Sequence, residues 1–286
     1  MHESLRPIKA AWSGLTLSGA PREGRAMPIR TSYVAFRTAA EPPLTVAGRL
    51  NTIPREDGAR TPAVVICHGS DGVDGRGEFH ARALNAAGLA TLEIDMWAAR
   101  GSARGAAARP RSPVETLPDA FAAKAFLAAQ PEVEPERIGI MGFSWGGVVS
   151  LLAATQAAQT LSAGAPPFRG HVALYPVCWA YGVVPGLSLE ALTGAPILIQ
   201  AGEADAYDDP DGLDQLLARL PEASRRVIRG VTHPGAGHGF DRDAPAQTIV
   251  DPFAHKGEGG PVLMAFHPEA AETARRLAVE FFASLP

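Results

Sequence analysis

Cysteine is nearly absent from the 286-residue chain, which contains only Cys67 and Cys178. Two cysteines cannot form the disulfide framework on which small secreted proteins depend, and a thiol within an apolar run behaves as a small hydrophobic group. The chain also lacks a signal-like apolar stretch after Met1, and it has no apolar run long enough to span a membrane. We therefore expect a cytoplasmic protein that has no membrane partner.

A surplus of positive charge is missing as well. The 26 Lys and Arg residues face 30 Asp and Glu residues, which gives a net charge of −4 without a basic block. Nucleic acids and anionic membranes attract clustered Lys and Arg, so neither is expected as a partner. Apolar residues make up 46% of the chain, enough at this length for a sizeable core. We expect a globular protein, and the sequence is compatible with a homo-oligomer.

Strand-like and helix-like segments alternate along most of the chain. Thr31–Thr38 and Leu44–Ile53 alternate apolar and polar residues, as half-buried antiparallel strands do. Beyond them, continuous apolar runs typical of strands buried on both faces alternate with segments of helical spacing. This order predicts an α/β protein with a mainly parallel sheet, an antiparallel N-terminal edge and helices on both faces. The expected strands are 63–67, 90–94, 137–142, 171–175, 196–200 and 226–229, and the expected helices are 79–87, 118–129, 146–158, 213–220 and 269–284.

The N-terminal segment differs from the rest of the chain in its amino-acid composition and periodicity. Residues 1–30 are rich in Gly, Pro, Arg and Ser and lack clean periodicity, so we interpret them as an extension. Residues 31–286 contain no sign of a second core, an internal repeat or a charge tract. A single catalytic domain over 31–286 is therefore the simplest interpretation.

A G-x-S-x-G pattern links an expected strand to an expected helix at Gly142-Phe143-Ser144-Trp145-Gly146. In such a turn a strained backbone lifts the serine Oγ above the sheet, and side chains at the two glycine positions would collide with neighbouring backbone. The N-terminus of the following helix favours the negative charge that develops during acyl transfer. Ser144 is therefore the predicted nucleophile, and the Trp145 N–H is a predicted oxyanion donor.

A serine hydroxyl needs a positioned base, and after this turn the order along the chain is Ser, then Asp or Glu, then His. Asp205 follows an expected buried strand, at the edge where open α/β sheets place their sites. It is the predicted acid, with Asp208 as the main alternative. Asp208, Asp209 and Asp211 are otherwise expected to cap the helix over 213–220.

His238 is the predicted base, because it lies in a glycine-rich loop after the last strand and can be brought over the serine. His233 is closer to the strand end and is expected to be structural, and His267 precedes the C-terminal helix. His233, His238, Asp241 and Asp243 also form a cluster of possible metal ligands. Their spacing matches no zinc pattern, so neither a metal nor another cofactor is expected.

The loop Cys67–Gly72 follows the first buried strand, where a fold with this serine turn places the second oxyanion donor. The backbone N–H of Ser70 is the predicted donor, with Asp71 as the neighbouring alternative. His68 is expected to hold the loop through a structural hydrogen bond rather than to take part in the reaction.

The segments around Ser144, Asp205 and His238 together resemble the dienelactone hydrolase family of the α/β-hydrolase superfamily, over roughly residues 31–286. The resemblance implies an α/β-hydrolase fold, a triad of these three residues and hydrolysis of carboxylic esters or lactones. Members that open dienelactones usually carry cysteine where this chain has Ser144. A serine needs its base to take the hydroxyl proton, whereas a cysteine thiol can be largely ionised without one. Because the nucleophile differs, the resemblance does not identify a dienelactone as the substrate of this chain.

The resemblance also implies arginines that bind the carboxylate of the lactone. Arg242 lies four residues after the predicted base, as one of them does, and Arg100 in Asp-Met-Trp-Ala-Ala-Arg is the candidate for the other. The alternative is that both are solvated surface charges. Trp97 and Phe240 are candidate walls of the substrate pocket, although aromatic residues at such positions also serve as core.

These residues predict a serine hydrolase that cleaves a small ester or lactone through an acyl-enzyme, without a cofactor. Peptidases and acyltransferases use the same triad, and small changes around the oxyanion also give C–C hydrolases and perhydrolases. A non-catalytic ligand receptor is a further alternative. Covalent labelling of Ser144 by a fluorophosphonate separates the receptor from the enzymes.

Overall fold

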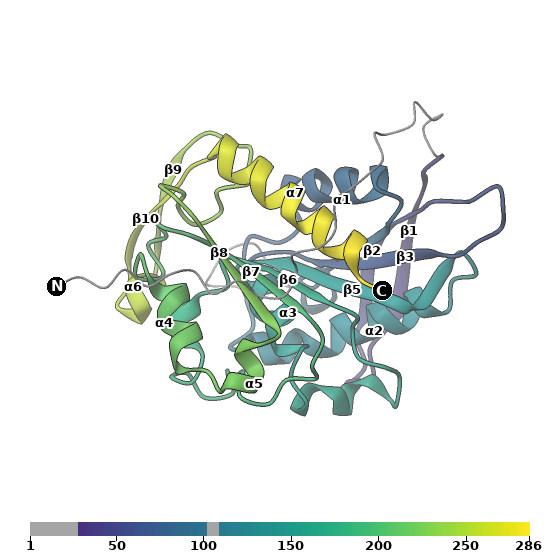
Figure 1. Ribbon diagram of the computed structural model, residues 1–286, viewed down its shortest axis with the longest axis horizontal. Coiled ribbons are helices and arrows are strands. Elements are labelled where there is room, and N and C mark those ends of the chain that lie inside the picture. Colours follow the sequence, from purple (N-terminus) through teal and green to yellow (C-terminus); the bar gives the residue numbers. More distant parts are fainter. Residues whose placement is uncertain (1–27, 102–108) are drawn as a thin grey trace.

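Eight strands form one sheet in the computed structural model, which describes residues 28–101 and 109–286 (Figure 1). The strand order is β1-β2-β4-β3-β5-β6-β7-β8; β1 pairs with β2 and β2 with β4 in antiparallel fashion, and the remaining pairs are parallel. The mainly parallel sheet with an antiparallel N-terminal edge is thus confirmed. The bounds are β1 Arg30–Arg37, β2 Thr45–Thr52, β3 Thr61–Cys67, β4 Ala90–Asp95, β5 Val133–Phe143, β6 His171–Leu174, β7 Ile197–Gly202 and β8 Ile228–His233.

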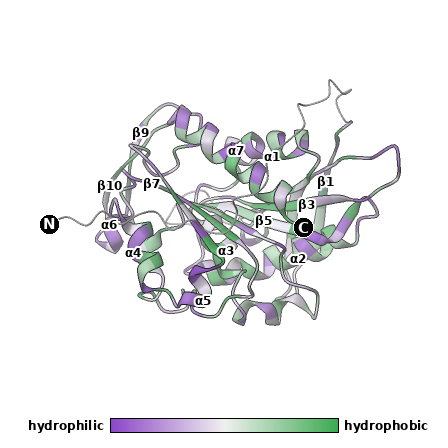
Figure 2. Cartoon of the chain, viewed as in Figure 1, coloured by the Kyte–Doolittle hydropathy of each residue, from purple (hydrophilic) through white to green (hydrophobic). Residues whose placement is uncertain are grey.

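Helices cover both faces of this sheet (Figure 1). The helices α1 and α7 pack together on one face, and α2 and α3 on the other. Side chains alternate between the faces along each strand, so Val64 and Met141 join one apolar cluster while Val65 and Ile140 join the other. Figure 2 shows the hydrophobic residues concentrated in the strands between the layers. The helix bounds are α1 Gly75–Ala86, α2 Leu117–Ala128, α3 Trp145–Leu152, α4 Gly212–Arg219, α5 Glu222–Arg225 and α7 Pro268–Ser284.

Several predicted elements have different bounds in the structure; α1 and β5, for example, each begin four residues before the predicted starts at 79 and 137. The helix expected over 146–158 ends at Leu152, because the Thr155 hydroxyl donates to Leu152 O at 2.7 Å and accepts from Ala158 N. A threonine hydroxyl that bonds to nearby backbone competes with helix continuation. The last strand begins at Ile228 and runs to His233, whereas the sequence placed it at 226–229.

A β-hairpin that the sequence analysis did not predict lies beyond the main sheet. β9 (Gln247–Asp251) pairs with β10 (Gly260–Met264) in antiparallel fashion, and the short helix α6 (Ala254–Gly257) connects them. The hairpin lies at the end of the molecule toward which the carboxyl ends of the parallel strands point (Figure 1). Its inner residues Ala254, Val262 and Met264 form a separate small apolar cluster with Tyr207, which lies in the loop after β7.

None of the helices among the described residues is long and apolar enough to cross a membrane. Within the predicted N-terminal extension, residues 1–27 lie outside the described part of the chain, and β1 begins at Arg30. The assignment of residues 31–286 to one domain stays a prediction.

Phe282 of α7 provides a direct test of how this helix packs on the sheet. The ring is 2% exposed, and a Cβ added at Gly139 of β5 would come within 2.4 Å of its Cε1. Phe282→Ala should lower the free energy of unfolding by about 3–5 kcal/mol, because it leaves a cavity against the strand. Chemical denaturation measures this loss. Phe281→Ala removes a neighbouring, only partly buried ring and should cost less; an equal or larger loss would contradict this packing.

Candidate active site

Ser144 occupies a sharp turn between β5 and α3. Its φ of 51° and ψ of −113° are strained for a residue with a side chain. A Cβ at Gly146 would come within 2.1 Å of Cys67 O, and one at Gly142 within 2.2 Å of the Gly146 carbonyl carbon. The Ser144 N–H donates to Leu174 O on the neighbouring strand at 2.9 Å. Both glycines therefore permit a close backbone approach that a larger residue would prevent.

The three residues of the predicted triad lie within hydrogen-bonding distance of one another. His238 Nε2 is 2.9 Å from Ser144 Oγ, and His238 Nδ1 is 2.8 Å from Asp205 Oδ2. The other oxygen of Asp205 accepts from Tyr207 N at 2.9 Å. With the Nδ1–H bonded to the carboxylate, Nε2 can accept the hydroxyl proton of the serine. His238 and Asp205 are 3% and 4% exposed, so water competes little with either bond.

Two tyrosines pack against the imidazole of His238. The Tyr207 ring centroid lies 4.2 Å from that of His238, and the Tyr175 centroid lies 4.8 Å from it. The Tyr175 hydroxyl donates to Asp241, three residues after the histidine, and His80 Nε2 lies 2.8 Å from the same carboxylate. Burial alone would raise the pKa of Asp241, but the hydrogen bond and charge of His80 outweigh it and the pKa is lowered. These contacts fix the loop that carries His238.

Asp208, the alternative acid, lies elsewhere. Its carboxylate accepts from the backbone N–H groups of Cys178 and Trp179 at 2.6 and 2.7 Å. Burial, with the nearby charge of Asp205, raises the pKa of Asp208 to about 6. The expectation that it caps the next helix is wrong, because its loop folds onto the turn at Cys178–Ala180 instead.

The other two expected caps are also wrong. Asp209 pairs with Lys256 at 2.9 Å, and Asp211 precedes α4 without a side-chain bond to the backbone of its first turn. Asp211 accepts instead from the Gln215 side chain one turn later. Of the four aspartates in this loop, therefore, Asp205 is the one that bonds to His238.

The loop after β3 lies beside the nucleophile, and Ser70 lines the same cavity as Ser144. Ser70 O accepts from Trp97 Nε1 at 3.0 Å, and Ser70 Oγ accepts from Arg109 at 2.5 Å. Trp145 is the first residue of α3, and its indole donates to Thr116 Oγ1 at 3.1 Å. Both predicted oxyanion donors thus adjoin the serine.

His68 has the structural role that the sequence suggested. Its Nδ1 donates to Gly69 O at 2.8 Å, and its Nε2 accepts from Met96 N at 2.9 Å. Burial lowers the pKa of His68 to about 4, so the ring is neutral at physiological pH. The ring therefore connects the loop after β3 to the end of β4.

Three of the four predicted substrate-binding residues make structural contacts: Trp97 and Phe240 are buried, and Arg100 is half-buried. Arg100 binds the carboxylate of Asp119 through two bonds of 2.6 and 3.1 Å and donates further to Met96 O and Glu115 O. Trp97 packs between other aromatic rings behind the Ser70 loop, and Phe240 is fully buried against Tyr175. None of the three lines the cavity around Ser144.

Arg242, the fourth, is more accessible. Its side chain is 27% exposed, and its Nε lies 3.9 Å from Asp74 Oδ2. It too lies outside the residues that line the cavity at Ser144. Because its ion pair is long and partly solvated, Arg242 holds its position less firmly than Arg100 does.

The cavity at Ser144 has a volume of about 180 Å³. Several of its walls were missed by sequence reasoning, because they come from segments far apart in the chain. Tyr207 could have been noticed two residues after the acid, and the alternation in 247–251 and 260–264 is a hairpin signal. The lining residues are Ser70, Asp71, Arg76, Ser144, Tyr207, His238, Ile249, Val250, Asp251 and Met264.

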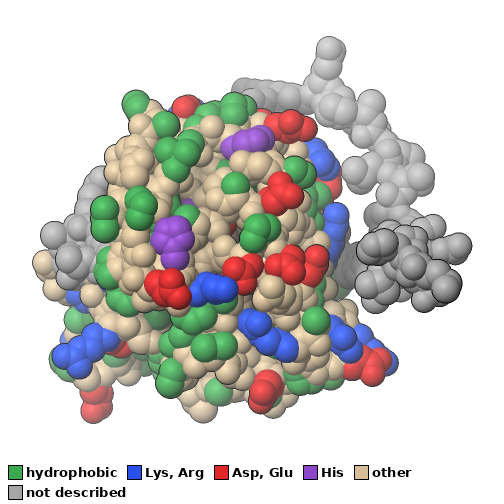
Figure 3. Space-filling view, turned by 90° about the vertical axis from the view of Figure 1, so that its left-hand side faces the viewer, with side chains coloured by type: hydrophobic (Ala, Val, Ile, Leu, Met, Phe, Trp, Pro, Cys, Tyr) green, Lys and Arg blue, Asp and Glu red, His purple; other side chains and the backbone are tan. Residues whose placement is uncertain are grey.

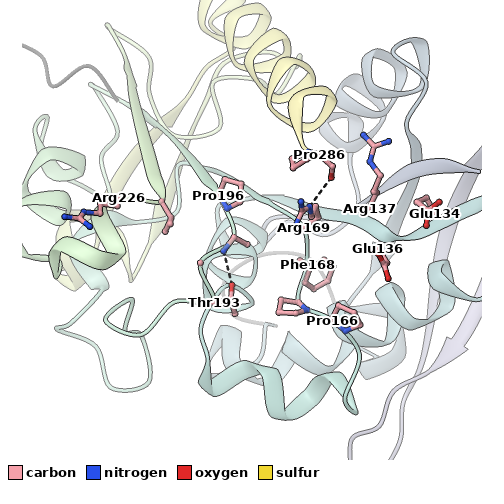
Figure 4. Close-up of a pocket in the computed structure, with 14 residues that line it drawn as sticks. Glu134, Glu136, Arg137, Pro166, Phe168, Arg169, Thr193, Pro196, Arg226 and Pro286 are labelled. Atoms are coloured by element: carbon pink, nitrogen blue, oxygen red, sulfur yellow. Dashed lines mark hydrogen bonds between the residues drawn. The ribbon is translucent and has the colours of Figure 1, made fainter. Parts of the chain in front are cut away.

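A larger cavity of about 1160 Å³ lies at the opposite edge of the sheet, near the amino ends of β7 and β8 (Figure 4). Figure 4 shows Arg226 and Arg137 at opposite sides of it, and Arg169 donating to Pro286 O. Its lining contains no nucleophile beside a base, so the smaller cavity is the candidate active site.

The histidines and aspartates that the sequence grouped as possible metal ligands have separate partners. His233 Nε2 lies 3.1 Å from Gln200 Oε1, His238 contacts the serine and Asp205, and Asp241 bonds to Tyr175 and His80. Within the described ranges, no group of three or more His, Cys, Asp or Glu side chains is placed to hold a metal ion.

The fold and this arrangement agree with a family comparison. The model of the dienelactone hydrolase family matches residues 50–285. The chain belongs to this family. It is accordingly a hydrolase with the α/β-hydrolase fold, as the sequence resemblance implied.

Individual relatives support the same assignment. A probable 2-oxo-3-(5-oxofuran-2-ylidene)propanoate lactonase of Bradyrhizobium sp. is 30% identical over 188 residues, which cover 63% of this chain and 74% of that protein. A putative dienelactone hydrolase from Klebsiella pneumoniae has a TM-score of 0.64 at 19% identity and covers 88% of this chain and 99% of its own. Esterase 2 of Thermogutta terrifontis, phosphorylated by paraoxon, has a TM-score of 0.59 at 15% identity over 90% and 96% of the chains. At these identities the two structures show the fold alone.

Arg100 is expected to contribute to stability, because its partner Asp119 has a fully buried side chain. Arg100→Ala leaves that carboxylate buried without its cation and should lower the free energy of unfolding by about 3–5 kcal/mol. Arg82→Ala breaks an exposed pair with Glu78 and should cost less than about 1 kcal/mol. Urea denaturation of both variants checks the difference. Equal small losses would show that Arg100 is not a structural residue.

Proposed function

We propose that this dienelactone hydrolase family member is a serine hydrolase that cleaves carboxylic esters or lactones of small molecules through an acyl-enzyme. The observation that carries the proposal is the continuous line of hydrogen bonds from Ser144 Oγ through His238 to Asp205. This is the arrangement in which a base activates a serine while a carboxylate fixes the imidazole tautomer.

The proposed reaction has two halves. The Ser144 oxygen attacks the carbonyl carbon as its proton passes to His238 Nε2, and the imidazolium then gives this proton to the leaving alcohol. Water next attacks the acyl-enzyme, with His238 again taking a proton, and the acid leaves as Ser144 is restored. Asp205 stays ionised and stabilises the imidazolium in both halves.

The negative charge on the carbonyl oxygen requires donors fixed in advance. We assign this role to the backbone N–H groups of Trp145, at the start of α3, and of Ser70, in the loop after β3. Such donors cost little reorganisation at the moment of reaction, and losing one costs on the order of 10²–10³ in turnover. The proposed chemistry requires no metal or organic cofactor.

The substrate in this proposal is a small molecule. The cavity of about 180 Å³ is smaller than the pockets of roughly 300–1,000 Å³ that hold drug-sized ligands. The Bradyrhizobium relative is described as a probable lactonase, which supports a lactone or ester substrate for this chain. A long polymer would find no matching groove in the residues that line this cavity.

Replacing the nucleophile tests the proposal directly. Ser144→Ala should reduce turnover of p-nitrophenyl acetate by at least about 10⁴-fold, because no group remains to form the acyl-enzyme. The same variant should lose covalent labelling by a fluorophosphonate, measured by intact-protein mass spectrometry. Ser162→Ala, in a turn away from the cavity, should keep both properties. Labelling or turnover that persists in Ser144→Ala would refute the assignment.

The pH dependence tests the base. A histidine base that has gained a proton can no longer accept the serine proton, so kcat/KM should fall on the acid side of neutrality. Other groups also titrate there: burial raises the pKa of Glu93 to about 7 and that of Asp208 to about 6. The acid limb should therefore persist in Glu93→Gln and Asp208→Asn. A limb that disappears in either variant would assign it to that carboxyl group instead.

A further inference from the structure

The cavity at Ser144 has two chemically different sides. Polar groups line the side formed by the main fold: Ser70, Asp71, Arg76, Ser144 and His238. The hairpin side contributes the apolar side chains of Ile249, Val250 and Met264, and the Tyr207 ring adjoins them. A bound ester or lactone would therefore direct its carbonyl toward the main fold and its hydrocarbon part toward the hairpin.

One charged group, Asp251, interrupts the apolar hairpin side, but its charge is compensated. Its Oδ2 accepts from the Tyr207 hydroxyl at 2.7 Å, and its Oδ1 accepts from Phe253 N at 2.8 Å. Arg109 Nη2 lies 3.7 Å from the same carboxylate. Asp251 is only 4% exposed, so it fastens the hairpin to the main fold rather than presenting a free charge.

Tyr207 connects Asp251 of the hairpin to the catalytic triad. Its hydroxyl bonds to Asp251, its ring lies against the His238 ring, and its backbone N–H donates to Asp205. Met264 approaches the triad from the hairpin itself, because a Cβ added at Gly239, the residue after His238, would come within 2.8 Å of its Cε. The hairpin thus limits the space directly beside the catalytic base.

The hairpin is held by a small part of the core. Its inner residues Val262 and Met264 belong to the separate apolar cluster. Within residues 28–101 and 109–286, only the half-buried Val177 packs against both this cluster and a main one. Leu263, on the outer face, is 60% exposed, and Val250, which borders the cavity, is 81% exposed. Figure 3 shows this end of the molecule, where hydrophobic side chains lie scattered among acidic and basic ones.

We propose that the β9–β10 hairpin is the specificity-determining wall of the active site, with Met264 and Ile249 limiting the acyl group and Asp251 anchoring the wall. The preferred substrate is an ester or lactone with a compact, apolar acyl part. A volume of about 180 Å³ holds roughly six water molecules, which favours a two- to four-carbon acyl group over an eight-carbon chain. This inference rests on the proposed serine hydrolase function.

The experiment compares kcat/KM for p-nitrophenyl acetate, butyrate and octanoate. The wild-type protein should prefer acetate or butyrate to octanoate. Met264→Ala removes part of the wall and should raise the octanoate-to-acetate ratio about tenfold, since a few methylene groups gain room. Leu263→Ala is the matched control: it truncates the neighbouring residue on the outward face of the same strand and should change the ratio less than about twofold.

The role of Asp251 as the anchor of the hairpin is tested with a second variant and its own control. Asp251→Asn keeps an oxygen for Tyr207 but removes the charge that faces Arg109, so it should also raise the octanoate-to-acetate ratio. Asp57→Asn weakens an exposed pair with Arg55, outside the hairpin, and should leave the ratio unchanged. Ile249→Ala, a half-buried position outside the main clusters, should repeat the effect of Met264→Ala and serves if that variant fails to fold.

The outcomes separate this inference from the proposed function. If the wild-type protein hydrolyses none of the esters, or if Ser144→Ala keeps the activity, the proposed function fails. If the wild type is an active, Ser144-dependent esterase but already prefers octanoate, the inference alone is overturned. The same holds if Met264→Ala and Ile249→Ala shift the ratio no more than Leu263→Ala does.

Discussion

The site depends on the close approach of three backbone segments at the nucleophile: the end of β3, the end of β5 and the start of α3. The start of α3 lies against the end of β3, where a Cβ at Gly146 would collide with Cys67 O. Because no side chain separates them, the turn at Ser144 and the loop at Ser70 meet in one small cavity. The strain in the Ser144 backbone is offset by its bond to Leu174 O and by the packed helix that follows.

Hydrogen bonds buried behind the site then fix the catalytic side chains. Asp205 and Asp241 bind groups on either side of the His238 ring, and each carboxylate has at least two partners. Arg76, also buried, pairs with Asp74 and donates to the Tyr175 hydroxyl. Polar groups that are fully bonded in a low-dielectric interior hold a single geometry, and this precision is what general-base catalysis requires.

Local sequence patterns predicted the parts of the molecule that depend on neighbours in the chain. The buried strands, the turn at Ser144 and an acid directly after β7 each leave a short, recognisable signature. The cavity walls do not, because Arg76, Tyr207 and Met264 meet only after the chain folds. Arg100 shows the opposite error: its position after β4 suggested a substrate contact, but Asp119 on α2 lies within reach and binds it. A charge pattern in one segment cannot reveal a partner in another.

The separate apolar cluster beneath the hairpin has a consequence for how the molecule can change. Substitutions at sites that share no packing partners usually have additive effects on stability, whereas neighbours in one core are coupled. The hairpin meets the main core chiefly through Val177, so changes at Ile249 or Val262 should combine almost independently with changes in the sheet. Apart from Asp251 and Met264, which contact Tyr207 and the turn at Gly239, the 18 residues from Gln247 to Met264 can thus be varied as a module, while the scaffold that carries Ser144, Asp205 and His238 stays as it is.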